Sequence, residues 1–338
     1  MLNSIQTLRA LAAWLVVGHH YIQVAHNFPL NDPVSASLHK YGAIGVDLFF
    51  IISGFVIYIS TAGKTITPSM FAIHRLARIA PAYWLFTLIT AATLIFLPGA
   101  IPLTQFEPVF MLKSLLFIPA QNPSGIGMYP LVTVGWTLNY EMAFYAIFLI
   151  SLFLPRTYRI PAITLSIALL CKALPSIGGD LAFYKNPIVF EFLFGIFIAY
   201  AYQKGLVQRI NLLAAAFMAS AALAAIVYFG QVTHTPLKSG LPCAIVLLSA
   251  LSQERFFTRT AAINKLGDWS YSTYLCHVLV ICYMIKLQQL LTLNTTATFA
   301  MIVVITIVVS WFSFHLIERP ISNLAKTGMK KLAFEKTY

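Results

Sequence analysis

The chain has few charged residues and no long polar stretch. Only 9% of its 338 residues are Asp, Glu, Lys or Arg, whereas about a quarter are charged in an ordinary soluble domain. The mean hydropathy is +0.81. This balance excludes a disordered chain, a coiled coil, a secreted disulfide scaffold and a conventional cytosolic enzyme. It leaves a polytopic membrane protein, with any chemistry within the membrane or at its edge.

Acidic residues and cysteines are also scarce. Lys and Arg number 22 against 10 Asp and Glu, which gives a formal net charge of +12. The basic residues are scattered between apolar runs, so the excess predicts membrane topology and not nucleic-acid binding. The four cysteines form no CxxC pair, so neither a metal site nor a disulfide framework is expected. The first apolar run is not closed by a small-x-small cleavage site and is expected to be a retained span.

Ten apolar runs predict ten transmembrane helices, because one span needs roughly 20 apolar residues. The runs fall at about 6–25, 42–62, 79–98, 137–154, 160–176, 187–203, 211–229, 239–252, 269–288 and 297–317. The predicted fold class is therefore an all-α polytopic membrane protein. We expect residues 1–322 to form the integral membrane domain and residues 323–338 a basic cytoplasmic tail. The long, proline-rich but apolar segment 99–136 is expected to lie on or dip into the outer face.

The distribution of positive charge orients these spans. If the N-terminus is inside, few of the 22 Lys and Arg residues fall in outer segments. Those few are Lys40, Lys113, Lys172, Lys185, Lys238 and Lys286. Because cytoplasmic loops carry the excess of Lys and Arg, both termini are predicted to be cytoplasmic.

Several ionisable residues lie inside the predicted spans, where such groups are costly and are candidates for function. Arg9 and His20 are eleven residues apart, so they lie on one helical face about 16 Å apart. Asp47 and Glu141 each lie a turn or two below the outer surface, on two further helices. His20, Asp47 and Glu141 thus share a depth, which a single site requires. Glu191 lies near the same level and is a weaker candidate; the alternative for each acid is a buried pair with a neighbouring helix.

Two further groups of ionisable residues lie near span ends. Arg75 and Arg78 are three residues apart on one helical face at the inner surface. They are either ordinary topological charge or a clamp for phosphate groups, which suit guanidinium forks. His277 falls inside the ninth predicted span. Glu318–Pro320 ends the tenth span and is expected to be a structural Glu-Arg pair.

Taken together, these residues resemble the family 3 membrane acyltransferases, which O-acylate bacterial surface glycans. The motifs that carry the resemblance are, in chain order, Arg9 with His20, Gly45–Phe55, Arg75 with Arg78, Trp136–Tyr145, Ser270–His277 and Glu318–Pro320. Many members carry an acidic residue three positions before the arginine. This chain has Gln6 there, as in the branch that resembles exopolysaccharide-production acetyltransferases. The motifs span nearly the whole chain, which makes the resemblance specific.

The resemblance implies a donor of the acetyl-CoA type, a glycan acceptor and no permanently bound cofactor or metal. We expect Arg9, Arg75 and Arg78 to bind the donor at the inner face. His20 is expected to act as general base on a sugar hydroxyl or as a transient acyl carrier. Asp47 or Glu141 would orient His20, and the Gly42–Gly45 region would allow close approach of the acceptor. The expected supporting residues are Ser53, Trp136, Tyr140 and His277.

The implied location is the bacterial inner (plasma) membrane, with acyl-CoA, a glycan and the lipid bilayer as partners and no nucleic acid. Two alternatives stay open. A transporter of a glycan precursor or an anion would use intramembrane Arg, His, Asp and Glu equally well, although no repeated pair of broken helices is visible. The acceptor is either a glycan polymer or a polyprenyl-linked sugar, and the sequence does not separate the two.

Overall fold

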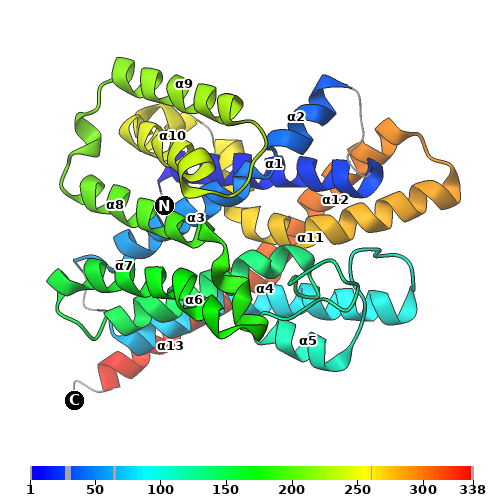
Figure 1. The fold of residues 1–338 in the computed structure, drawn as a ribbon, viewed down its shortest axis with the longest axis horizontal. Helices are drawn as coiled ribbons and strands as arrows, with labels where there is room; N and C mark the ends of the chain where they lie inside the picture. Colours follow the sequence, from blue (N-terminus) through cyan, green and yellow to red (C-terminus); the bar gives the residue numbers. More distant parts are fainter. Residues whose placement is uncertain (1, 27–31, 64–65, 260, 336–338) are drawn as a thin grey trace. The chain divides into compact units, whose positions relative to one another are not determined.

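The computed structural model describes residues 2–26, 32–63, 66–259 and 261–335. Within these ranges the regular structure is helical and includes no strand (Figure 1). The α-helices are α1 (Asn3–His26), α2 (Pro33–Tyr41), α3 (Ile44–Thr61), α4 (Pro68–Phe96), α5 (Pro108–Leu115), α6 (Trp136–Ser151), α7 (Arg156–Lys172), α8 (Glu191–Gln203), α9 (Leu212–Phe229), α10 (Leu241–Ser252), α11 (Ala261–Leu291), α12 (Thr295–Ser313) and α13 (Arg319–Glu335). Each of the ten predicted apolar runs overlaps one of these helices, so the all-α prediction is confirmed.

Six helical segments of the described chain are long and apolar enough to cross a membrane. They are Pro33–Thr61, Pro68–Phe96, Arg156–Ile177, Leu212–Phe229, Ala262–Leu291 and Thr295–Gly328. A seventh is added if the pair Gly179–Lys185 and Pro187–Gln203, bent by 53°, forms one span. Helix α1 is not among the six, and Gln6, Arg9, His19 and His20 lower its hydropathy. Its apolar side chains are largely buried against other helices, so this helix does not need the uniform apolarity of a lipid-facing span.

The chain divides into two compact units. The first unit comprises residues 1–64, 167–176 and 184–274, and the second comprises 65–166, 177–183 and 275–338. Helices α1, α2, α3, α8, α9 and α10 belong to the first unit. Helices α4, α5, α6, α12 and α13 belong to the second.

Glycines bring the helices of the first unit into close contact. A Cβ atom at Gly54 of α3 would lie 2.1 Å from the carbonyl oxygen of Phe192 in α8, and one at Gly195 of α8 would lie 2.0 Å from that of Ile51. The two helices therefore meet backbone to backbone at this crossing. Packing of this kind, through small residues, is typical of helices in membranes.

The second unit has its own core. Phe71 of α4 stacks on Phe148 of α6 with ring centroids 5.3 Å apart. The segment 99–136 is packed and not a loose linker: the buried Asn122 donates to the Thr104 hydroxyl and to the Tyr129 carbonyl. α13 runs through the boundary expected at residue 322, so the described part of the basic tail begins as a helix. Residues 336–338 of that tail lie outside the described residues.

The outward faces of two helices are strongly apolar. On α9, Leu213 is 82% exposed and Phe217 is 75% exposed, while Ala215 and Ala222 face the protein. α12 similarly exposes Val304. Apolar faces of this extent are typical of surfaces that contact lipid. The structure therefore supports a multi-pass membrane protein.

Candidate active site

Helix α1 carries two of the predicted site residues, Arg9 and His20. It runs without a break from Asn3 to His26. At 1.5 Å rise per residue, eleven residues separate Arg9 and His20 by about 16 Å along the axis. The predicted spacing along one helix is therefore confirmed.

The N-terminal end of α1 is held by an amide and carboxylate network. Glu254 accepts hydrogen bonds from the backbone amides of Asn3 (2.5 Å) and Ser4 (3.1 Å), which stabilises the start of the helix. Arg9 donates to the Gln6 side-chain oxygen at 3.3 Å, and the Gln6 amide donates to Asp268 of α11. Gln6 thus links Arg9 to an acid without bearing a charge itself.

The C-terminal end of α1 gathers histidines. His20 pairs with Gln23 through Nδ1 at 2.6 Å, and His19 meets the Leu38 carbonyl of α2 at 3.2 Å. The rings of His19 and His20 are 5.4 Å apart, edge to face. The ring of His39 is parallel to that of His19, with centroids 6.3 Å apart.

Asp47 of α3 is fully buried and pairs with a histidine that the sequence did not single out. Its Oδ2 atom lies 2.8 Å from Nδ1 of His234, in the segment between α9 and α10. The buried carboxyl group of Glu191, at the start of α8, interacts directly with Asp47. The partner that the structure shows for Asp47 is thus His234. Its expected role in orienting His20 stays a prediction.

The Gly42–Gly45 region does not offer space to an acceptor, so that expectation was wrong. A Cβ at Gly45 would lie 2.2 Å from the Ala12 carbonyl oxygen, and one at Gly42 would lie 2.8 Å from both the Leu15 carbonyl oxygen and the His19 Cβ. Helix α1 occupies the space beside these two glycines. Their small size lets α3 pack against α1 and brings Asp47 to the histidine end of that helix.

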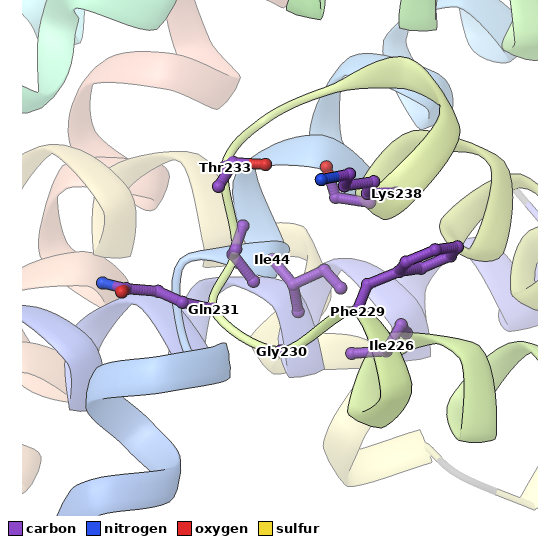
Figure 2. Close-up of a pocket in the computed structure, with 9 residues that line it drawn as sticks. Ile44, Ile226, Phe229, Gly230, Gln231, Thr233 and Lys238 are labelled. Carbon is purple, nitrogen blue, oxygen red and sulfur yellow. The ribbon is translucent and has the colours of Figure 1, made fainter.

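A pocket lies next to His234 in the same unit. It is lined by Ile44, Ile226, Phe229, Gly230, Gln231, Val232, Thr233, Lys238 and Ser239. Figure 2 shows Thr233 and Lys238 on one side of it and the apolar side chains of Ile44, Ile226 and Phe229 on the other. The pocket volume of about 10 Å³ is room for one water molecule.

In the second unit, Arg75 and Arg78 lie one turn apart on α4, as predicted. Arg78 forms an ion pair with Glu318, whose side chain is completely buried. The guanidinium of Arg75 lies over the Phe71 ring, 5.5 Å from its centroid. The expected structural role of Glu318 is supported, but its partner is Arg78 of α4 and not the adjacent Arg319. Adjacent side chains on a helix do not face each other, so Glu318 pairs with a residue of another helix instead of with Arg319.

The other predicted residues of the second unit lie on α6 and α11. Glu141 accepts a hydrogen bond from Tyr145, one turn along α6, at 2.5 Å. Tyr140 is buried and donates to the carbonyl of Phe183, and Trp136 packs edge-on against its ring at 6.0 Å. His277 is completely buried in α11. Ser53, in the first unit, is partly buried on α3.

Three contributors to these networks were missed or undervalued from sequence. His234 lies in a short polar segment with no recognisable spacing, and its distance in sequence from Asp47 gave no signal. Asp268 lies just before the motif Ser270–His277 and was not singled out. Glu191 was predicted as a weaker candidate from its depth, and the structure shows that it interacts with Asp47.

The fold and these polar residues define a class of protein: a multi-pass membrane enzyme with ionisable groups buried among its helices. Comparison with known families then identifies the class more closely. The profile described as an acyltransferase domain (Acyl_transf_3) matches residues 2–315. The chain belongs to this family, and it is an acyltransferase.

Several curated proteins are similar over most of their length. The exopolysaccharide production protein ExoZ of Rhizobium meliloti is 32% identical over 83% of this chain and 89% of its own. The acyltransferase MdmB of Streptomyces mycarofaciens is 28% identical over 83% and 79%. The putative membrane-bound transacylase BcsY of Komagataeibacter xylinus is 27% identical over 94% and 82%. No solved structure matches the chain.

Proposed function

We propose that the protein is an O-acetyltransferase of the bacterial inner membrane. It moves an acetyl group from cytoplasmic acetyl-CoA to a hydroxyl of a cell-surface or exported glycan, or of a polyprenyl-linked precursor. The family membership and the similarity to a protein named for exopolysaccharide production support this proposal. The observation that carries it is the single helix α1, which bears a cation at one end and a histidine about 16 Å away.

The positive-charge distribution supports ten spans with both termini in the cytoplasm. In that orientation Arg9, Arg75 and Arg78 lie at the inner face, where guanidinium groups suit the phosphates of CoA. The pantetheine arm is thin enough to follow α1 toward His20. His20 then acts as general base on the sugar hydroxyl or carries the acetyl group for part of the cycle. Glu141, Ser53, Trp136, Tyr140 and His277 support the site.

Binding of acetyl-CoA to the purified protein in nanodiscs tests the donor site. We expect saturable binding that weakens about tenfold or more in Arg75→Ala, because a charge-assisted contact to phosphate contributes about 1.5–3 kcal/mol. Arg159→Ala is the matched control, since Arg159 lies on the same predicted side and bonds to the carbonyls of Leu152 and Leu154. The affinity of this control variant for acetyl-CoA should equal that of the wild type.

Arg78→Ala needs a second variant, because it leaves Glu318 buried without its partner and destabilises the fold. Arg78→Ala combined with Glu318→Gln removes that penalty and isolates the effect on the donor. Equal affinity for acetyl-CoA in the wild type, in Arg75→Ala and in this double variant would contradict the proposed clamp. No binding by monodisperse wild-type protein would contradict acetyl-CoA as donor.

A further inference from the structure

His234 is held by a buried acid in the manner of a catalytic histidine. Its Nδ1 atom lies 2.8 Å from Asp47 Oδ2; the Asp47 side chain is fully buried, while the His234 side chain is 20% exposed. A carboxylate at this nitrogen fixes the tautomer of the ring and stabilises the imidazolium that forms when the opposite nitrogen takes a proton. The pair therefore has the geometry of a general base that can be reached from outside the core.

A second buried acid, Glu191, is next to Asp47. Glu191 is completely buried and interacts with Asp47. Within the described residues, Asp47 Oδ1 and both carboxyl oxygens of Glu191 accept no hydrogen bond from the protein. Two carboxylates buried side by side repel each other, and a proton held between them relieves this repulsion. Three groups thus form a chain from the fully buried Glu191, through Asp47, to the partly exposed His234.

The backbone at His234 is strained. Its φ angle is +53°, in the left-handed region that residues other than glycine rarely adopt. The segment is anchored on each side: Val232 donates to the Lys40 carbonyl at 3.0 Å, and the Ser239 amide donates to the Thr235 carbonyl at 3.0 Å. Such strain persists where the surroundings enforce it, and it is common at functional sites.

The small pocket beside His234 has one polar wall and one apolar wall. Thr233, adjacent to His234 in the chain, and Lys238 supply a hydroxyl and an ammonium group on one wall (Figure 2). Phe229 and Ile44 supply an apolar wall opposite. His19 interacts electrostatically with His234, and its ring contacts that of His20. The pocket, His234 and His20 therefore lie at the same end of the first unit.

We propose that His234 is the base that deprotonates the acceptor hydroxyl, with Asp47 and Glu191 as its positioning residues. This proposal rests on the proposed function and assigns the two steps of that reaction to two histidines.

In the first step, His20 attacks the thioester carbonyl, the C–S bond breaks and CoA leaves as a thiolate. The sugar oxygen then attacks the acetyl carbon on His20, the C–N bond breaks and the ester forms. The hydroxyl proton moves to Nε2 of His234 and is finally taken up by the thiolate, so no net proton is released.

The test separates the two half-reactions. The protein in nanodiscs is mixed with radiolabelled acetyl-CoA, first alone and then with a panel of methyl glycosides. A thiol reagent measures the burst of CoA released without a sugar, and the label on the glycoside measures transfer. We expect His234→Gln to lower transfer about 100-fold or more and to leave the CoA burst within about twofold of wild type. The matched control is His315→Gln, because His315 is a histidine in the second unit that bonds to a carbonyl of its own helix.

Two further measurements separate a chemical role from a structural one. Added imidazole should restore part of the transfer in His234→Ala, because the partly exposed site can admit a free base. Glu191→Gln, which preserves shape, should lower kcat for transfer and leave KM for the glycoside unchanged. If wild type transfers label and His234→Gln transfers it equally well, or if its CoA burst falls together with transfer, the assignment is overturned. If wild type transfers no label to any acceptor, the proposed function fails and the assignment fails with it.

Discussion

The two ends of helix α1 carry polar networks of different chemistry. At the N-terminal end, Arg9 is linked through the neutral Gln6 to Asp268, and Glu254 binds the free amides of the helix. At the C-terminal end, histidines gather beside the buried pair of Asp47 and Glu191. The first network holds a permanent cation. The second consists of imidazole rings and buried carboxyl groups.

This difference fits a division of labour along one helix. A guanidinium is always charged, so it suits the binding of a polyanion and not proton transfer. Histidine changes its charge near pH 7 and suits proton transfer or nucleophilic catalysis. Changes at the histidine end should therefore alter turnover, whereas changes at the arginine end should alter donor affinity.

The largest expected effect follows from His20→Ala. Because both proposed roles of His20 require its imidazole, transfer of labelled acetyl to a glycan should fall about 1000-fold or more. Binding of acetyl-CoA should change little, since the Arg9 end is untouched. His315→Ala serves as control. Full activity of His20→Ala in a membrane assay would refute its assignment.

A smaller loss is expected for Asp47→Asn. The amide is isosteric and can still hydrogen-bond His234, but it cannot stabilise an imidazolium, so kcat should fall about 100-fold with KM for the sugar nearly constant. The control is Asp180→Asn, which breaks an exposed ion pair with Lys113 and should be silent. Steady-state kinetics, with thermal unfolding to verify the fold, measures both. An unchanged kcat in Asp47→Asn would remove the carboxylate from the mechanism.

The smallest effect tests the arginine end. Asp268→Asn removes the acid behind Gln6, so Arg9 is held less firmly and KM for acetyl-CoA should rise about three- to fivefold while kcat stays nearly constant. Gln6→Glu in the same background restores an acid next to Arg9 and should recover the wild-type KM. If the double variant is worse than Asp268→Asn alone, Gln6 and Asp268 do not act through Arg9.

The sequence predicted much of the fold because membrane helices have a simple signal. Each of the ten apolar runs overlaps one of the thirteen α-helices of the described chain, and Arg9 and His20 lie on one helix as predicted. The short α10 and the segment Pro187–Gln203, which meets Gly179–Lys185 at a bend of 53°, are less clear as spans. Helices surrounded by protein do not need twenty apolar residues. The number of spans and the orientation stay predictions.

The site was predicted less completely, because its side chains come from different helices and meet only in the folded protein. The depth of Asp47 and Glu191 in their helices marked them as unusual, because buried acids are costly. Their contact with each other and with His234 depends on how α3, α8 and the α9–α10 segment pack, which no spacing encodes. The pairing of Arg78 with Glu318 was missed for the same reason. The glycines near Asp47 were expected to allow close approach of the acceptor, whereas they are the points where α1 packs.

Transfer across a sealed membrane tests the central claim most directly. Proteoliposomes are loaded with radiolabelled acetyl-CoA, and alkali-treated exopolysaccharide from Rhizobium meliloti is added outside. The account predicts alkali-labile acetyl label on the external polysaccharide while free CoA stays within the vesicles, and neither product with His20→Ala. Label that leaves the vesicles as intact acetyl-CoA, or polysaccharide that never acquires label, would contradict an acetyltransferase and favour a transporter.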